Sequence, residues 1–394
     1  SSTTVLNALL IPVVGNYLRR LEVRLTDAGM NAPVYMVQSN GGVATPAKAA
    51  KQPARLLLSG PSGGAKAAEI IAKRINSPNL VAVDMGGTSY DVSLVEDGRV
   101  HLVNEGEVDG CPVRLPMVEM RSIGAGGGSI ACTDTIGGMF VGPESAGSNP
   151  GPVCYGLGGQ LPTVTDADVT LGRIDPNNFA GGSMQLDPAS AADALMRSVG
   201  KSLDFTVEHA ALGVSEIVDE NMASAARVHG IESGKNLNDR TLIAFGGAAP
   251  VHASRVAKKL GIKKIFIPAG AGVGSALGFL RAPAAYEVVR SLYQHLSELD
   301  TKRVEQMFLE MRQQAQAIID ACQPKSVVKE TRKAFMRYIG QGHEIEVELP
   351  DEMKNEHDRG VLKQRFDKEY RLQYARIIPD MDIEILSWSL RLYA

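Results

Sequence analysis

The segment VAVDMGGTSYDVSLVEDGRV, residues 81–100, constrains the fold more than any other part of the sequence. An apolar strand ends at Asp84, two glycines and two hydroxyl residues follow, and a second strand then carries Asp91 towards an Asp-Gly turn. α/β proteins bind ligands at the carboxyl ends of such strands. Bare glycine backbone presents N–H groups that hold phosphate oxygens, and hydroxyl groups add donors. The candidate cofactor-binding residues of this segment are Gly86, Gly87, Thr88 and Ser89.

Asp84 and Asp91 are hard oxygen ligands of the kind that Mg²⁺ prefers. We predict that both are catalytic and that Asp84 also contacts the metal. The segment can also be interpreted as a tight hairpin in which the glycines serve turn geometry alone and Asp84 caps the turn. A turn requires about two special positions, so the longer pattern of acid, glycines and hydroxyls favours the phosphate site.

A second glycine pair lies in LIAFGGAAPVHASRVAKKLG, residues 242–261, where Gly246 and Gly247 join an apolar strand to an alanine-rich helix. We predict that this pair binds the cofactor, because a flat ring or ribose can lie on bare backbone and a helix N-terminus favours anions. Close helix–strand packing explains the pair equally well. His252, in the first turns of this helix, is interpreted as a structural residue.

Two further motifs are less specific. The segment IGAGGGSIACTD, residues 123–134, is a poor dinucleotide fingerprint, since a serine takes the place of the third glycine. It is interpreted as a loop whose backbone donors face the phosphates or the substrate, with a flexible surface loop as the alternative. Its candidate cofactor-binding residues are Gly126, Gly127, Gly128 and Ser129. In residues 145–173, Asp166 is a candidate metal or substrate ligand that can equally cap a turn, and Cys154 is interpreted as a buried, inert thiol.

The apolar periodicity predicts a helix over residues 3–28, a strand, Gly-Pro-Gly loop and helix over 54–75, and a strand meander over 80–104. Residues 124–162 are rich in glycine and proline, and are too long for a structureless linker inside a domain. Helices are expected at 188–200 and 206–230, and a βαβ unit at 241–268. The predicted domains are 1–77, 78–283 and 284–394, of which the last is a small α+β domain with a helix at about 351–374.

Composition narrows the possible partners and location. The formal net charge is −3 with no basic stripe, which argues against nucleic acid. Four cysteines lie far apart, and no apolar run reaches the length of a membrane span. We therefore expect a cytoplasmic protein with no membrane or nucleic-acid partner.

The order and spacing of the two Gly-Gly motifs match the nucleotide-binding half of the actin, Hsp70 and sugar-kinase fold. Along most of its length the chain resembles the A-type subunit of the hydantoinase/5-oxoprolinase family. The segments that carry the resemblance are MVQSNGG, LSGPSGGAKAA, DMGGTSYDVSL, SIGAGGGSIA, VGPESAGSNPGPVCYG, PTVTDADVTLGR, AFGGAAPVHA and RYIGQGHEIEVELP.

This resemblance implies an α/β fold with an actin-like (ribonuclease H-like) ATPase lobe and a mixed sheet. It implies ATP and Mg²⁺, with Mn²⁺ or Zn²⁺ as alternative metals, and a B-type subunit or domain in a hetero-oligomer. The leading hypothesis is an ATP-dependent hydrolase of cyclic amides such as hydantoins, 5-oxoproline or lactams. An ATP-dependent carboxylase of ketones such as acetone or acetophenone is the alternative. A nucleotide switch without substrate chemistry is a third hypothesis, and a sugar kinase is disfavoured because nothing resembles a sugar site.

The sequence departs from the family pattern in two places. The first phosphate loop of the family, an acid-Gly-Gly-Thr turn near the N-terminus, is not found here, so we expect a partial chain that lacks the N-terminal lobe. Ala249 stands where a third glycine is common in the Gly-Gly motif. The first departure predicts that another chain or segment completes the ATP cleft.

Overall fold

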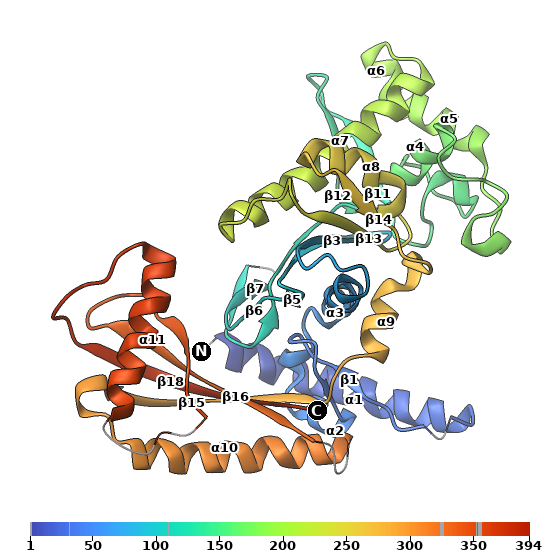
Figure 1. Ribbon diagram of the computed structural model, residues 1–394. Helices are drawn as coiled ribbons and strands as arrows, with labels where there is room; N and C mark the ends of the chain where they lie inside the picture. The colour runs from blue at the N-terminus through green and yellow to red at the C-terminus, as the bar shows by residue number, and fades with distance from the viewer. Residues whose placement is uncertain (1, 31, 109, 324–326, 352, 354–356) are drawn as a thin grey trace. The chain divides into compact units, whose positions relative to one another are not determined.

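The computed structural model describes residues 2–30, 32–108, 110–323, 327–351, 353 and 357–394 (Figure 1). The α-helices are α1 (Ser2–Asp27), α2 (Pro46–Lys51), α3 (Ser59–Arg74), α4 (Val164–Thr170), α5 (Pro188–Leu195), α6 (Lys201–Leu203), α7 (Val207–Glu232), α8 (Ala249–Leu260), α9 (Gly274–Leu280), α10 (Thr301–Cys322) and α11 (His357–Tyr374). The strands are β1 (Met36–Val37), β2 (Val43–Ala44), β3 (Leu80–Met85), β4 (Tyr90–Glu96), β5 (Arg99–Val100), β6 (Leu102–Val103), β7 (Gly106–Val108), β8 (Cys111–Val113), β9 (Met117–Val118), β10 (Met120–Ile123), β11 (Ser129–Thr133), β12 (Met139–Ser145), β13 (Thr241–Phe245), β14 (Lys264–Phe266), β15 (Ala285–His295), β16 (Lys329–Tyr338), β17 (Ile345–Glu348) and β18 (Ile383–Tyr393).

The contacts divide the chain into two units. Unit 1 comprises Ser1–Leu57, Glu107–Pro116 and Ala282–Ala394, and unit 2 comprises Leu58–Gly106 and Met117–Arg281. This division differs from the predicted domains because α3 packs with the sheet of unit 2, whereas the segment before it belongs with the C-terminal region. The sequence places these parts far apart, so a division by chain order does not reveal that they form one unit.

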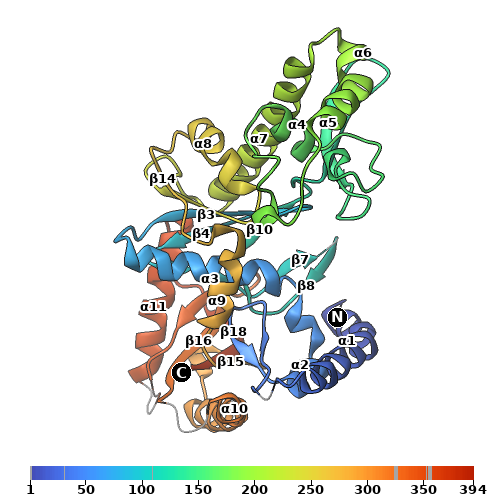
Figure 2. The same ribbon diagram turned by 90° about the vertical axis from the view of Figure 1, so that its right-hand side faces the viewer.

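Unit 2 is built around a mixed sheet with the strand order β10-β4-β3-β13-β14, with β5 paired to β4. β3, β13 and β14 are parallel, whereas β4 runs antiparallel to β3. Strand residues alternate between the two faces, so Val81, Val83 and Met85 pack with α7 and α8. Leu80 and Ala82 face the other way and pack with residues of α3. The α3 helix lies on the opposite side of the sheet from α7 and α8 (Figure 2). The α/β class and the mixed sheet agree with the sequence-based expectation.

The start of α3 differs from the prediction of a strand followed by a Gly-Pro-Gly loop. Residues 53–56 form a 3₁₀ turn, Leu58 adopts φ 60°, and the helix begins at Ser59, so the glycines lie in its first turns. A Cβ on Gly63 would lie 2.2 Å from the Phe279 ring, and one on Gly64 would lie 3.2 Å from Oδ2 of Asp84. These glycines therefore allow close packing of the helix, which outweighs their poor helix propensity.

Unit 1 contains an antiparallel sheet with the order β15-β18-β16-β17. Trp388 of β18 is fully buried and meets Phe308 of α10 edge-on, with ring centroids 6.0 Å apart. Most of the apolar face of α10 lies in the same core. The α+β character expected after residue 284 is present. The predicted helix at 351–374 begins at His357, and residues 352 and 354–356 lie outside the described part of the chain.

α1 lies where the periodicity predicts a helix, but most of its apolar side chains are not covered. Of its described residues Leu18 is buried, whereas Leu9 and Val13 are each 67% exposed and Tyr17 is 60% exposed. Periodicity predicts the helix and its apolar residues, but it does not show what packs on them. Among the described helices, none combines the length and apolar character needed to cross a membrane.

Candidate functional site

Three glycine-rich segments meet at one edge of the sheet in unit 2. They follow β3, β13 and β14, which are neighbouring parallel strands and therefore end at the same edge. Hydrogen bonds join the segments: Ala248 N donates to Met85 O at 3.0 Å, and Gly246 N donates to Ala271 O at 2.9 Å. The topology thus brings together the two Gly-Gly motifs that the sequence analysis singled out, and adds a third segment that it did not.

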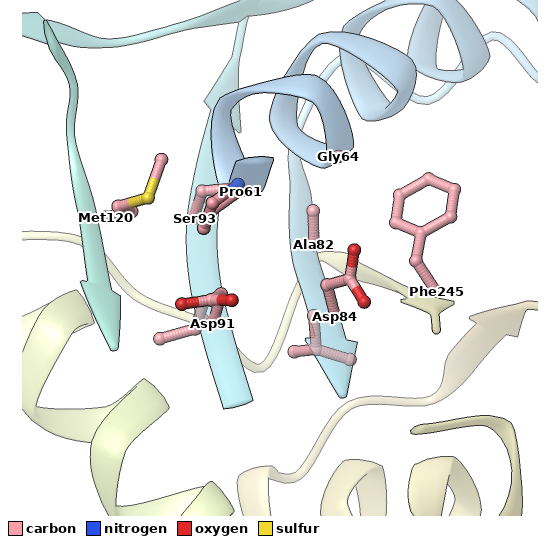
Figure 3. A pocket seen from close by; sticks show the side chains of 10 residues that line it. Pro61, Gly64, Ala82, Asp84, Asp91, Ser93, Met120 and Phe245 are labelled. Atoms are coloured by element: carbon pink, nitrogen blue, oxygen red, sulfur yellow. The ribbon is translucent and has the colours of Figure 1, made fainter. Parts of the chain in front are cut away.

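Asp84 and Asp91 stand directly opposite each other on β3 and β4, so their side chains share the face of the sheet that carries α3. They line a small pocket with Gly64 of α3 and Phe245 of β13 (Figure 3). The α3 helix presents its N-terminal turns to this pocket, where the helix dipole favours negative charge. The pairing of the two predicted catalytic carboxylates is therefore a direct consequence of the hairpin register.

The two carboxylates differ in their surroundings. Asp84 accepts a hydrogen bond from the Ser275 hydroxyl at 2.6 Å. Asp91 accepts one from the Ser122 hydroxyl. Burial raises the pKa of Asp91, and the charge of Asp84 adds to the rise, while hydrogen bonds from Ser122 and Ser89 oppose it. A cation between the carboxylates would relieve this repulsion.

The turn that joins β3 to β4 is open to solvent. Gly87, Thr88 and Ser89 are exposed, and Gly86 N donates to Ser89 O at 3.2 Å to close the turn. A Cβ built on Gly86 or Gly87 would meet no described atom within 4 Å. The turn therefore has free space on its outer side, and its predicted contact with phosphates remains a prediction.

The loop of Gly126, Gly127 and Gly128 differs from the expectation that its donors face a ligand. Gly127 N donates to Gly86 O at 2.9 Å and Gly128 N donates to Gly87 O at 2.7 Å. The loop is buried, and Ser129 turns its hydroxyl inward to accept from Gly126 N at 2.8 Å. The loop supports the 86–89 turn from behind, because the N–H groups of Gly127 and Gly128 already donate to carbonyl oxygens of that turn.

The Gly246–Gly247 pair divides into two roles. Gly246 adopts φ +81°, and a Cβ there would lie 2.3 Å from Met85 O, so this glycine is required by close packing against β3. Gly247 is exposed and has no described atom within 4 Å of a Cβ. The accessible position for a ring or ribose is therefore Gly247. Close helix–strand packing, one of the two interpretations from the sequence, therefore explains Gly246 but not Gly247. Cofactor binding, the other interpretation, stays a prediction for Gly247.

Asp166 is a helix cap in the structure, which is the alternative that the sequence analysis set beside a metal or substrate ligand. Its fully buried carboxylate accepts hydrogen bonds from the backbone N–H groups of Val153, Cys154 and Thr163, and from the Thr163 hydroxyl. These donors occupy both of its oxygens in a capping box at the start of α4. Cys154 is buried as expected, and burial raises the pKa of its thiol.

Two features of the site were missed by the sequence analysis. Ser275, which holds Asp84, lies in the segment PAGAGVGSALG after β14. A third glycine-rich segment after a parallel strand was a usable sign of its position. His252 is fully buried between Asp168 and Asp219, whereas the sequence showed a single histidine on a helix. Its partners come from α4 and α7, and no local pattern connects them.

The oxygen-rich character of the site fits Mg²⁺. Mg²⁺ binds one or two carboxylates, keeps several waters and shares substrate phosphates, which matches Asp84 and Asp91 beside an open turn. Mn²⁺ takes the same ligands. A zinc site needs three or four protein ligands, mostly His nitrogen and Cys sulfur atoms. The described residues contain no cluster of three or more His, Cys, Asp or Glu side chains that could hold a metal.

The fold and the site define an α/β protein with a mixed sheet and a glycine-lined, acidic strand edge. The profile of the hydantoinase/oxoprolinase family matches residues 1–288, and this chain belongs to that family. The caprolactamase subunit alpha of Pseudomonas jessenii is 33% identical over 98% of this chain, and 56% of that subunit is covered. The acetophenone carboxylase gamma subunit of Aromatoleum aromaticum is 36% identical over 81% of this chain and 45% of its own length.

The fold agrees with that of a solved relative. The crystal structure of the ATP-dependent caprolactamase from Pseudomonas jessenii superposes with a TM-score of 0.82 at 33% identity, over all of this chain and 58% of the other. The present chain thus spans about half the length of the relatives that it matches. The activities of those longer proteins therefore bear on this chain only through the part of their sequence that it shares.

Proposed function

We propose that this chain is part of an A-type subunit that uses ATP to open a cyclic amide, such as a lactam, a hydantoin or 5-oxoproline. The similarity to the caprolactamase subunit alpha supports the hydrolase, and the solved caprolactamase of Pseudomonas jessenii is an ATP-dependent enzyme. The observation that carries the proposal is the β3–β4 hairpin, which places Asp84 and Asp91 side by side next to an exposed Gly-Gly-Thr-Ser turn.

In the proposed arrangement, the turn of Gly86, Gly87, Thr88 and Ser89 holds the phosphates of ATP. Asp84, with Asp91 opposite, would hold Mg²⁺ or its bound water, and the ion would supply positive charge that neutralises the phosphates. Gly247 offers bare backbone to the adenosine. Transfer of the γ-phosphoryl group of ATP to the amide oxygen, with ADP as the leaving group, would make the ring carbon a better electrophile. Water would then add to that carbon and the ring nitrogen would leave as an amine. A second water would hydrolyse the resulting acyl phosphate to a carboxylate and phosphate. The chain contributes positioning and charge to the phosphoryl transfer rather than a covalent group.

A ketone carboxylase is the second candidate, and the similarity to the acetophenone carboxylase gamma subunit favours it. In that reaction the same phosphate site would activate bicarbonate or an enolate instead of an amide. The described residues of the site serve either acceptor equally, because they face the nucleotide. In both cases we propose a cytoplasmic hetero-oligomer with a B-type subunit or domain that binds the substrate.

The test uses the complex purified with its co-purifying chains and a panel of a lactam, a hydantoin, 5-oxoproline and a ketone. We expect one of these to stimulate ATP turnover, and Asp84→Asn to lower that turnover about 100-fold or more. Asp97→Asn is the matched control, since Asp97 lies in the exposed β4–β5 turn at φ 48°, which asparagine tolerates. Equal turnover in Asp84→Asn and the control contradicts the assigned site.

Labelled bicarbonate separates the two candidates. Ring opening without incorporation of label supports the hydrolase, whereas ATP-dependent label in the product replaces it with the carboxylase. ATP hydrolysis that no panel member stimulates would favour a nucleotide switch over both enzymes.

A further inference from the structure

A buried cluster of charged side chains lies behind the site, and the mechanism above does not use it. The Nδ1 atom of His252 on α8 lies 2.8 Å from Oδ1 of Asp219 on α7. Its Nε2 atom lies 3.1 Å from Oδ2 of Asp168 on α4, as an ion pair rather than a well-directed hydrogen bond. All three side chains are at most 3% exposed, so the ion pairs operate out of contact with water.

Arg173 completes the charge balance of this cluster. Its Nη1 atom lies 3.3 Å from Oδ1 of Asp168 and also donates to the hydroxyl of Ser215, which in turn donates to Oδ2 of Asp219 at 3.5 Å. Two carboxylates thus face one guanidinium and one imidazole. A neutral imidazole would leave one buried negative charge unbalanced, and a charged imidazole balances both.

The cluster joins two helices that hold the glycine segments, since His252 lies in the first turn of α8 and Asp168 lies on the short helix α4. α8 begins at Ala249, and its N-cap residue Ala248 follows Gly247 and donates from its N–H to Met85 O at the end of β3. α4 holds the supporting loop, because Thr165 donates to Gly127 O from both its N–H at 2.7 Å and its hydroxyl at 2.8 Å. Gly127 in turn donates to Gly86 O in the proposed phosphate turn. A continuous set of contacts therefore joins His252 to both glycine turns.

We propose that His252 is a positioning residue, held as an imidazolium between Asp168 and Asp219, which sets the spacing between the Gly247 turn and the Gly86–Ser89 turn. Its importance for nucleotide binding rests on the proposed function, whereas its effect on the two turns does not. Burial alone would lower the pKa of His252, but the two carboxylates raise it to about 9. The charged form is then complete below the ordinary value of 6.5 and is lost as the pH rises through about 9.

The first test compares amide hydrogen exchange in His252→Gln with that in His229→Gln. His229 is a matched control, because it is also buried on a helix of unit 2. It lies in the last turn of α7, about ten residues after Asp219. We expect the amides of Gly127 and Ala248 to exchange at least about tenfold faster in His252→Gln and to remain unchanged in His229→Gln. Unchanged exchange in a folded His252→Gln variant, or an equal increase in both variants, overturns the proposal.

The second test uses the wild-type protein, so it decides the question even if His252→Gln does not fold. Side-chain NMR of His252 should show an imidazolium at pH 7.5. Protection of Gly127 and Ala248, corrected for the intrinsic rate, should fall between about pH 8 and 10 relative to the rest of unit 2. A neutral imidazole at pH 7.5, or protection independent of pH, overturns the proposal.

Binding of ATP, measured by calorimetry on the full complex, separates this inference from the proposed function. If the wild type binds ATP, we expect about fivefold weaker binding in His252→Gln and unchanged binding in His229→Gln. Equal affinity in wild type and His252→Gln overturns the role in nucleotide binding. If the wild type binds no ATP, the proposed function fails, and the exchange experiments still decide whether His252 positions the turns.

Discussion

The turn at residues 86–89 and the loop at residues 126–129 look alike in the sequence, yet the structure gives them opposite surroundings. Gly87 is exposed, with free space where a side chain would lie, whereas Gly126 is buried and a Cβ there would lie 2.5 Å from Thr88 N. The absence of a side chain at Gly87 leaves open space on the surface of the turn. The absence of a side chain at Gly126 allows the supporting loop to pack against the backbone of Gly87 and Thr88. Glycine in a candidate site therefore has two meanings, and the space around it distinguishes them.

The largest effect should come from Gly246→Ala, which tests a glycine that has both a positive φ and backbone atoms close to the position of an added Cβ. The substitution combines a φ of +81° with a Cβ 2.3 Å from Met85 O, and neither backbone can move without breaking the β3–β13 pairing. We expect a loss of about 4 kcal/mol in the free energy of unfolding. Urea denaturation measures it, and a loss under about 1 kcal/mol would show that Gly246 is not required by packing.

Gly126→Ala should have the next largest effect. Its Cβ would contact the backbone of Gly87 and Thr88, so the supporting loop and the turn must separate. We expect a loss of about 2–3 kcal/mol in the free energy of unfolding, together with loss of ATP turnover. Full turnover with unchanged stability would break the distinction between the two glycine segments.

Asp91→Asn should change stability in the opposite direction. The pKa of Asp91 is raised in the folded protein, so ionisation opposes folding at every pH above the ordinary value of 3.8. We expect the variant to be more stable than wild type by about 1 kcal/mol at pH 7, with the difference vanishing towards pH 3. Unfolding curves across this range measure it. A destabilised variant at pH 7 would show that the Asp91 charge is already compensated.

Gly87→Ala should have the smallest effect on stability, within about 0.5 kcal/mol, because the added methyl group meets open space. The same methyl group would occupy the surface that we assign to the phosphates, so ATP should bind several-fold more weakly. Calorimetry on the purified complex measures both quantities under one condition. Unchanged ATP affinity would place the phosphates elsewhere.

The sequence predicted those parts of the site that depend on short segments. The β3–β4 hairpin, the strand that ends at Phe245 and the helix with His252 follow from local periodicity and turn residues. Their meeting at one sheet edge follows from the rule for parallel strands. The role of Gly126 could not be predicted, because its partners are backbone groups whose positions appear only after folding. The capping role of Asp166 was one of the alternatives that the sequence offered, since its main partner Thr163 is only three residues away.

The same limit applies to the larger divisions. No local pattern indicates that residues 1–57 belong with the C-terminal region, or that the apolar residues of α1 are mostly exposed. His252 illustrates the point at one residue, since its two partners lie on other helices. Hydrophobic periodicity predicts a single helix or strand, but it does not predict which residues of different elements come into contact.

The pairing of β3 with β13 also bears on how the protein reaches its native state. Thr241 lies beside Leu80, although about 160 residues separate them, so the chain must close a long loop before these strands can meet. Such closure is slow, and the edge that carries both Gly-Gly turns does not exist until it is complete. A ligand that bridges the two turns would therefore select finished molecules over folding intermediates, and would slow unfolding rather than accelerate folding.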